Sequence, residues 1–238
     1  MRLKQDIGSS EIIDRTLTGG EIDMYPEYTG VIVGVLAGRG SAATTARATY
    51  DAARRFEATR GMQLLRMTPF ADALALAVRP AFARRHGLRT IADLRKLGSF
   101  VFGGAPENRT RYQGLVGMRR AYGLTNARFK LTPIGTQYRA LDTGSVDVAN
   151  VLTTDGQLRS GRYVVLRDTK RIFGFQNVAP VVRRAVLARV GPRFTATLDA
   201  VSARLTDRAM QAMNGAVDID HRSPASVARA FLKAQGLL

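Results

Sequence analysis

The 238-residue chain contains no cysteine and only two histidines, His86 and His221. Without cysteine it forms no disulfide and offers no thiolate for catalysis or metal binding. The two histidines stand far apart in the sequence, each next to an arginine, and lack the close spacing of metal ligands. We therefore expect no metal site and no cofactor.

Long hydrophobic runs are also missing. The longest apolar stretches, residues 31–37 and 73–78, are much shorter than the roughly 20 residues that span a bilayer. The N-terminal sequence MRLKQDIGSSEII lacks the apolar core of a signal peptide. As written, the chain is expected to carry no transmembrane helix and no export signal. Its hydrophobic content of 45% is enough to fill the core of a globular protein.

Acidic residues are few beside the basic ones, 19 against 36, which gives a net charge of +17. Such an excess of positive charge is typical of proteins that bind nucleic acid. The basic residues are nearly all arginine, however, and are scattered singly or in pairs such as Arg54-Arg55 and Arg119-Arg120. No run of five like charges occurs in the sequence, and aromatic residues are sparse. We expect no nucleic-acid partner.

Helix and strand signals alternate along the chain, which predicts an α/β protein with largely parallel sheets. Residues 8–10 favour a helix cap, and Gly19 and Gly20 favour a helix end. The expected helices cover residues 11–18, 42–59, 91–96 and 114–122, and the expected strands cover residues 22–25, 73–78 and 100–102.

A short internal repeat connects two distant parts of the chain. The segment RTLTGGEID, residues 15–23, aligns with RALDTGSVD, residues 139–147. A match this short also arises by chance in α/β proteins. As a true repeat, it would give each copy a helix, a glycine stop and a strand that opens on aspartate. The same register pairs Tyr28 with Leu152 and Thr29 with Thr153.

Ligands of open α/β sheets bind beyond the carboxyl ends of the strands. Two similar lobes would thus place Tyr28 and Leu152 on opposing walls of one cleft. Thr29, with the glycine after it, is expected to cap a helix that starts at Val31 and to leave N–H groups facing the cleft. Tyr25 is expected to be structural. Glu27 has no nucleophile, base or metal partner in the pattern, so we predict no catalytic residue and no enzyme.

Four segments together resemble a known family. They are GEIDMYPEYTG at residues 20–30, VDVANVLTTDG at 146–156, FGFQNVAPVVRR at 173–184 and the C-terminal stretch from LTDRAMQAMNG to VARAFLKAQGLL. In this order and spacing they are similar to the substrate-binding component of ABC importers for glycine betaine, choline, carnitine and related osmoprotectants. The resemblance covers essentially the whole chain.

The resemblance implies a type II periplasmic-binding-protein fold, in which two α/β lobes are joined by two crossovers. Lobe one is then residues 1–79 with 180–238, and lobe two is residues 80–179. The lobes close around the ligand in a hinge motion that the permease recognises. Family members carry a strand and a helix ahead of the segment that here reads RLKQDIGSS. The given sequence lacks them, and we expect that the true start of the protein lies upstream of Met1.

A trimethylammonium ligand donates no hydrogen bonds, so the family binds it with tyrosines through cation–π attraction, worth about 0.5–2 kcal/mol per contact. The first cage position falls on Tyr28. The others fall on Leu74, Leu152 and Gln176, with Phe175 beside Gln176. One aromatic wall of four is thus kept.

A carboxylate on the ligand is bound in the family by a lysine, a threonine and an arginine. The arginine matches Arg111, with Arg109 as a rival. The threonine position is Val31, Thr153 follows a cage position, and the lysine position lies outside this chain.

The predicted function is therefore a solute-binding component of an ABC importer that binds a small osmoprotectant-like or quaternary-amine solute in the cleft. Its expected partners are that solute and the permease subunits; the protein is expected to be a monomer, in the periplasm or another extracytoplasmic place. One alternative is a ligand-sensing module of the same fold, and another is a truncated, non-functional copy. The changed cage predicts weak binding of glycine betaine, or another solute.

Overall fold

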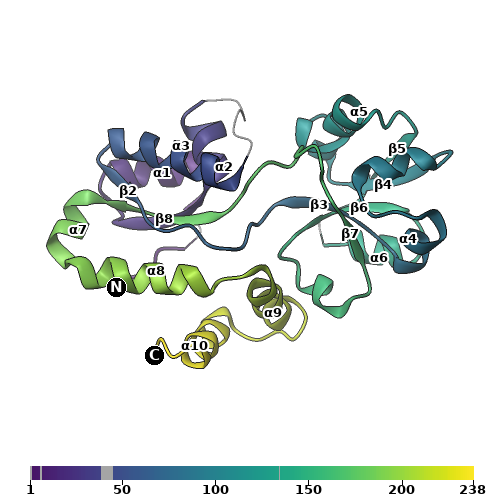
Figure 1. Ribbon diagram of the computed structural model, residues 1–238. Coiled ribbons are helices and arrows are strands. Elements are labelled where there is room, and N and C mark those ends of the chain that lie inside the picture. Colours follow the sequence, from purple (N-terminus) through teal and green to yellow (C-terminus); the bar gives the residue numbers. More distant parts are fainter. Residues whose placement is uncertain (1, 6, 39–44, 134) are drawn as a thin grey trace. The chain divides into compact units, whose positions relative to one another are not determined.

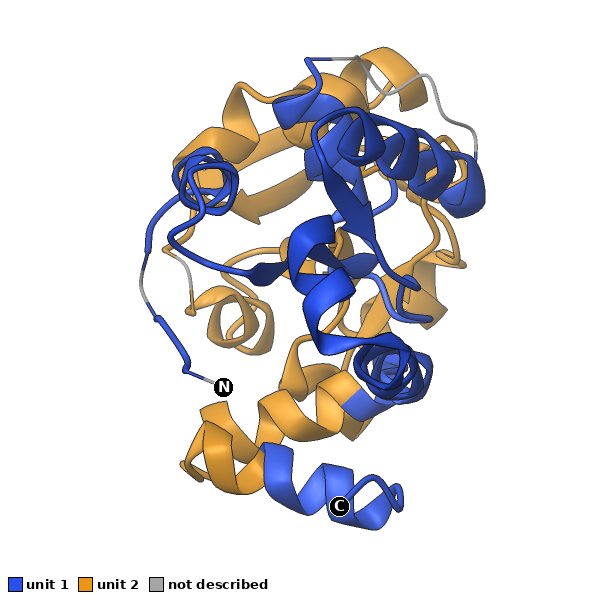
Figure 2. Cartoon of the chain, turned by 90° about the vertical axis from the view of Figure 1, so that its left-hand side faces the viewer, with its two compact units in different colours: residues 1–72, 175–209, 228–238 blue, residues 73–174, 210–227 orange. Residues whose placement is uncertain are grey.

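The computed structural model describes residues 2–5, 7–38, 45–133 and 135–238. It divides into two compact units, coloured separately in Figure 2. Unit 1 comprises Met1–Asp72, Phe175–Ala209 and Ala228–Leu238, and unit 2 comprises Ala73–Gly174 and Met210–Val227. The units are defined by compact packing, whereas the lobes expected from the sequence are parts that move as rigid bodies. The predicted lobes, residues 1–79 with 180–238 and residues 80–179, therefore stay a prediction.

Unit 1 is built on a sheet with the strand order β1-β8-β2, in which both neighbouring pairs are antiparallel. Its strands are β1 (Met24–Tyr28), β2 (Met62–Leu64) and β8 (Val178–Arg183). Its helical segments are α1 (Ser10–Thr18), α2 (Thr29–Val31), η1 (Ile32–Leu36), α3 (Ala46–Thr59), α7 (Arg184–Val190) and α8 (Pro192–Arg204). Figure 1 shows α1 and α3 on one side of β8 and α7 and α8 on the other.

The alternation of strand β8 explains this layering. Ala179 and Val181 are fully buried in an apolar cluster that includes residues of α1 and α3. Val182 points to the opposite face, where it packs with Val186 of α7. Successive side chains of a strand point to opposite faces of a sheet, so β8 supplies both cores of unit 1.

Unit 2 is built on a sheet with the order β5-β4-β6-β3-β7. Its strands are β3 (Leu74–Val78), β4 (Phe100–Gly104), β5 (Ala127–Leu131), β6 (Val148–Leu152) and β7 (Val164–Leu166). Its helical segments are α4 (Pro80–His86), η2 (Ile91–Lys96), η3 (Pro106–Arg109), η4 (Tyr112–Val116), α5 (Gly117–Tyr122), α6 (Gln137–Asp142) and η5 (Gly156–Ser160). Leu76 of β3 faces the large core with α5, and Ala77 faces a second core with α6.

The C-terminal region is helical in both units. Helix α9 covers Asp207–Asp218 and helix α10 covers Pro224–Ala234. None of the helices in the described ranges is long and apolar enough to cross a membrane.

The α/β class is confirmed, but the expectation of largely parallel sheets is wrong. Strand β4 pairs in parallel with β5 and with β6, whereas the other pairs, β1-β8, β2-β8, β3-β6 and β3-β7, are antiparallel. The alternation of helix and strand signals in the sequence did not reveal β8, which enters the sheet of unit 1 from a distant part of the chain.

Several predicted boundaries are also corrected. The strand expected at residues 22–25 is β1 and covers Met24–Tyr28. The helix expected to start at Val31 begins at Thr29, with Tyr28 as its N-cap, and the Thr29 side chain makes no hydrogen bond with the described residues. The helix expected at residues 42–59 is α3, which begins at Ala46 after the Thr45 cap; residues 42–44 lie outside the described residues.

The internal repeat is present in the structure. Each copy has a helix, a glycine with positive φ and a strand, α1 with β1 in unit 1 and α6 with β6 in unit 2. In the repeat register, Tyr28 matches Leu152. Their cross-strand partners, Val178 and Leu74, occupy matching places too, because both pairings are antiparallel.

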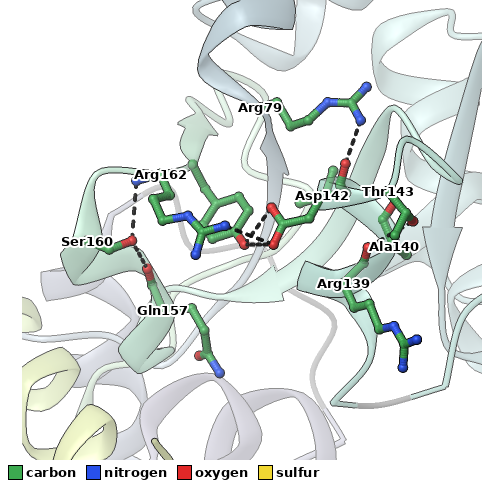
Figure 3. Close-up of polar contacts among 10 residues, drawn as sticks. Arg79, Arg139, Ala140, Asp142, Thr143, Gln157, Ser160 and Arg162 are labelled. Atoms are coloured by element: carbon green, nitrogen blue, oxygen red, sulfur yellow. Dashed lines mark hydrogen bonds and ion pairs between the residues drawn. The ribbon is translucent and has the colours of Figure 1, made fainter.

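An arginine closes the helix end in each copy. Arg79 Nη1 donates to the carbonyl oxygen of Leu141 at 2.6 Å, as Figure 3 shows. In unit 1, Arg183 Nη1 donates to the carbonyl oxygen of Gly20 at 3.2 Å. Arg79 follows β3 and Arg183 ends the matched strand β8, so the repeat extends beyond the segments that align in the sequence.

Candidate functional site

The candidate site of unit 1 lies where β1 ends and α2 begins. Pro26 belongs to β1, which is an edge strand and therefore tolerates a residue without an N–H donor. The backbone N–H of Thr29 donates to the carbonyl oxygen of Asn177 at 2.9 Å. The start of α2 is thereby joined to the segment that leads into β8.

Gly30 permits a close approach at this point. A Cβ atom at Gly30 would lie 2.6 Å from the carbonyl oxygen of Phe175 and 2.7 Å from Oε1 of Gln176. Any larger residue would push the two segments apart. The sequence thus brings together three of the predicted site residues in unit 1: Tyr28, Thr29 and Gln176.

Tyr28 is held by a carboxylate that the sequence did not point to. Its hydroxyl donates a hydrogen bond to Oδ2 of Asp72 at 2.9 Å. The backbone N–H of Asp72 in turn donates to the carbonyl oxygen of Gln176 at 3.1 Å. Burial, with the nearby charge of Asp72, raises the pKa of Tyr28, so the phenol stays protonated and acts as the donor.

Two polar atoms beside this pair are buried without a partner. Neither Oγ1 of Thr29 nor Oε1 of Gln176 has a hydrogen-bond partner in the part of the chain that the structure describes. A buried polar group that makes no hydrogen bond costs about 1–3 kcal/mol. Such groups call for a specific reason. Val31 is half-buried in α2, in the turn after Thr29.

A buried acidic cluster lies behind the site. The Tyr28 backbone N–H donates to Oε1 of Glu27 at 2.7 Å, and Glu27 is only 3% exposed. Arg60 binds both oxygens of Asp14 and donates to Oε2 of Glu57 at 3.2 Å. Arg60 therefore pairs with two of the three buried carboxylates, Asp14 and Glu57.

Burial governs the titration of this cluster. It raises the pKa of Glu57 to about 7, although Arg60 acts in the opposite direction. Burial also raises the pKa of Glu27. Tyr25 is buried in the core of unit 1, in agreement with the structural role expected from the sequence.

In unit 2, two predicted site residues are cross-strand partners. Leu74 begins β3 and lies opposite Leu152, which ends β6. Leu152 keeps 37% of its surface exposed, and Leu74 packs on the large core. Side chains opposite each other in an antiparallel pair stand on the same face, so these two leucines, predicted to occupy two of the family's cage positions, form an aliphatic surface.

Thr153 is occupied in holding the backbone. Its Oγ1 accepts from the Ala73 N–H at 3.0 Å, and its own N–H donates to the Ala73 carbonyl oxygen at 2.9 Å. Gln211 donates to the Thr153 carbonyl oxygen at 2.8 Å. The turn is completed by Asp155, which accepts from the Leu152 N–H and from the Tyr138 hydroxyl.

The two candidate arginines lie on another loop of unit 2. Arg109 ends η3, Arg111 precedes η4, and both are exposed. Neither guanidinium forms a salt bridge with any residue in the described ranges. Gly114 allows this loop to fold tightly, because a Cβ there would lie 2.1 Å from the carbonyl oxygen of Asn108. Either side chain is available for an anionic group.

Comparison with known proteins identifies the family. A model described as the substrate-binding domain of the ABC-type glycine betaine transport system matches residues 3–234. A glycine-betaine-binding protein of Pseudomonas aeruginosa is 33% identical over 231 residues, which cover 92% of this chain and 74% of that protein. The glycine betaine-binding protein YehZ of Escherichia coli is 26% identical over 98% of this chain and 80% of that protein.

The fold has close relatives among solved structures. A crystal structure of a glycine betaine/carnitine/choline ABC transporter superposes with a TM-score of 0.90 at 25% identity. The match covers 98% of this chain and 86% of that chain.

Proposed function

The chain belongs to the family of substrate-binding domains of ABC-type glycine betaine transport systems. We propose that its solute is a small molecule with a quaternary or other amine cation. The protein presents it to the permease of an ABC importer and catalyses no reaction. Members of the family are substrate-binding proteins rather than enzymes.

The observation that carries this proposal is the hydrogen bond of Tyr28 to Asp72 beside the buried oxygens of Thr29 and Gln176. The Tyr28 ring offers a face to a cation, an interaction worth about 0.5–2 kcal/mol. Asp72 places a negative charge at the edge of that ring. The unpartnered Gln176 oxygen is an acceptor, which favours a cation or an N–H donor over an anion, and the Thr29 hydroxyl can either donate or accept a hydrogen bond.

The proposed contributions of unit 2 are aliphatic and cationic. Leu74 and Leu152 supply apolar surface for the methyl groups or the carbon chain of the solute. Arg111, with Arg109 as the alternative, binds the carboxylate of a solute that has one. Val31 and Thr153 complete the proposed set, Val31 through its side chain and Thr153 by fixing the turn after Leu152.

This set favours solutes other than glycine betaine. One tyrosine replaces a cage of several, so the cation–π contribution is small, and aliphatic walls reward a solute with more carbon than glycine betaine has. We propose that glycine betaine binds weakly and that a bulkier quaternary amine binds more tightly. The protein acts as a monomer in an extracytoplasmic compartment, with the permease and the solute, but no nucleic acid, as partners.

Isothermal titration calorimetry against glycine betaine, choline, carnitine, a polyamine and a neutral amino acid tests the proposal. A saturable signal is expected for at least one quaternary amine, with glycine betaine weaker than about 1 µM, a free energy of about −8 kcal/mol. Submicromolar binding of glycine betaine would contradict the proposed preference. Binding of none of the amines would contradict the proposed ligand class.

A further inference from the structure

A hollow of about 820 Å³ lies in unit 1 and shares no lining residue with the candidate solute site. It is lined by α3, β2, the segment after β2, and side chains from α7 and α8. A volume of this size is typical of a small-molecule site. Five arginines line it: Arg47, Arg54, Arg55, Arg66 and Arg184.

The geometry of α3 explains why the arginines gather. Arg47, Tyr50, Arg54 and Ala58 recur every three or four residues and so share one face of the helix. This face is fixed against the segment after β2 by the Tyr50 hydroxyl, which donates to the carbonyl oxygen of Leu65 at 3.0 Å. The lining of the hollow combines these arginines with apolar residues such as Met62, Leu64 and Leu65.

Acidic groups compensate only part of this charge. Asp51 takes up two of the guanidinium groups, at 2.9 Å from Arg47 Nε and 3.8 Å from Arg54 Nη2. Among the described residues that line the hollow, Asp199 is the one acid, and it accepts from the backbone N–H of Arg66 at 2.9 Å.

Three guanidinium groups remain for a ligand. Arg55, Arg66 and Arg184 form no salt bridge within the described stretches of the chain, and all three are exposed. They come from three different elements, so their positive charges converge on the hollow instead of following one helix face.

We propose that this hollow is a second binding site, for a ligand that carries several phosphate oxygens. Arginine has a planar, permanently charged fork of donors that matches phosphate in two-point contacts. Several such forks around one concave surface suit a polyphosphate or a phospholipid head group better than a single carboxylate. The apolar side chains of the lining accommodate the uncharged part of either molecule.

The test compares two variants that lose the same charge. Arg55→Gln/Arg184→Gln removes two unpaired guanidinium groups from the hollow. Arg119→Gln/Arg120→Gln removes two exposed arginines from the end of α5 in unit 2 and serves as the matched control. Titration calorimetry with sodium tripolyphosphate at 0.15 M NaCl is expected to show saturable binding to the unchanged protein. The hollow variant should lose roughly tenfold or more in affinity, and the control less than about twofold.

Vesicles distinguish the two sources of phosphate. Co-sedimentation with phosphatidylglycerol vesicles, with phosphatidylcholine vesicles as reference, is measured for the same three proteins. Selective loss in the hollow variant, with either probe, supports the site and identifies its ligand as a free polyphosphate or a lipid head group. Equal loss of binding in both variants would show that the overall charge of +17, and not the hollow, binds the probe, and would overturn the proposal. Absence of binding to both probes would also overturn it. Binding of quaternary amines should be unchanged in the hollow variant, which separates this test from that of the solute site.

Discussion

The hydroxyl of Tyr28 donates a hydrogen bond to the carboxylate of Asp72 at 2.9 Å, across 44 positions of the sequence. The contact fixes the ring of Tyr28, the one aromatic residue that the family resemblance predicts for the cage. It also puts a negative charge next to that ring. The candidate site is therefore an aromatic face with a built-in anion.

Replacing Asp72 by asparagine should weaken the binding of cationic solutes. Asp72→Asn keeps the size of the side chain and an acceptor for Tyr28 but removes the charge. We expect an affinity loss of about tenfold for the best quaternary amine, equivalent to about 1.4 kcal/mol, and a weaker dependence on salt. Titration calorimetry at two salt concentrations measures both effects. Asp218→Asn, at an exposed position of α9, is the control; equal losses in the two variants would contradict a local role of Asp72.

An aromatic residue at Leu152 should restore part of the cage. Leu152 matches Tyr28 in the internal repeat and is 37% exposed, so a tyrosine fits there without repacking the core. Leu152→Tyr should raise the affinity for glycine betaine by about 2-fold to 30-fold, the range given by one cation–π contact of about 0.5–2 kcal/mol.

The control for this gain of affinity is Leu131→Tyr, which adds a tyrosine at an exposed position at the end of β5. It should leave the affinity unchanged. An unchanged affinity in Leu152→Tyr as well would remove Leu152 from the proposed site.

The close approach at Gly30 makes a prediction about stability. Gly30→Ala places a methyl group 2.6 Å from the carbonyl oxygen of Phe175 and should lower the free energy of unfolding by roughly 1–3 kcal/mol. Gly34→Ala, in the following η1 segment, meets no atom of the described residues within 4 Å. Since alanine is favoured over glycine inside helices by up to about 1 kcal/mol, the control should be neutral or stabilising. Urea denaturation decides the matter; equal stability of the two variants would show that the segments shift freely.

The buried cluster predicts a dependence of stability on pH. The pKa of Glu57 is raised from 4.5 to about 7, so between these values the folded state holds a proton that the unfolded state releases. The free energy of unfolding should therefore fall as the pH rises through this window, by an amount on the order of 3 kcal/mol at most. Glu57→Gln should remove this part of the dependence, because glutamine does not titrate.

Denaturant titrations at pH 5, 6, 7 and 8 measure this slope. The matched control is Glu21→Gln, at an exposed residue whose salt bridge with Lys4 spans 3.8 Å. It should keep the slope of the unchanged protein. If Glu57→Gln kept it too, the proton would reside elsewhere in the cluster.

The sequence predicted the parts of the site that belong to one continuous segment. The strand end at Tyr28 and its repeat at Leu152 are marked by apolar alternation and a glycine stop, which are local patterns. The sequence did not predict the contact of Asp72 with Tyr28, because that contact depends on the path of the chain between β2 and β3. The cluster of Asp14, Glu27 and Glu57 was not predicted either, because its members lie on three separate elements. Local sequence patterns likewise did not predict the antiparallel pairing of β8 with β1 and β2.

The proposed solute site is tested most directly by titrating the tightest-binding quaternary amine into three proteins: the unchanged chain, Tyr28→Phe and Tyr28→Ala. Phenylalanine keeps the ring and loses the hydrogen bond to Asp72, whereas alanine loses both. The expected affinities decrease in that order, and the ring itself accounts for a loss of about 2-fold to 30-fold between the two variants. Equal affinities in all three proteins, each with an unchanged melting temperature, would contradict a solute site at Tyr28.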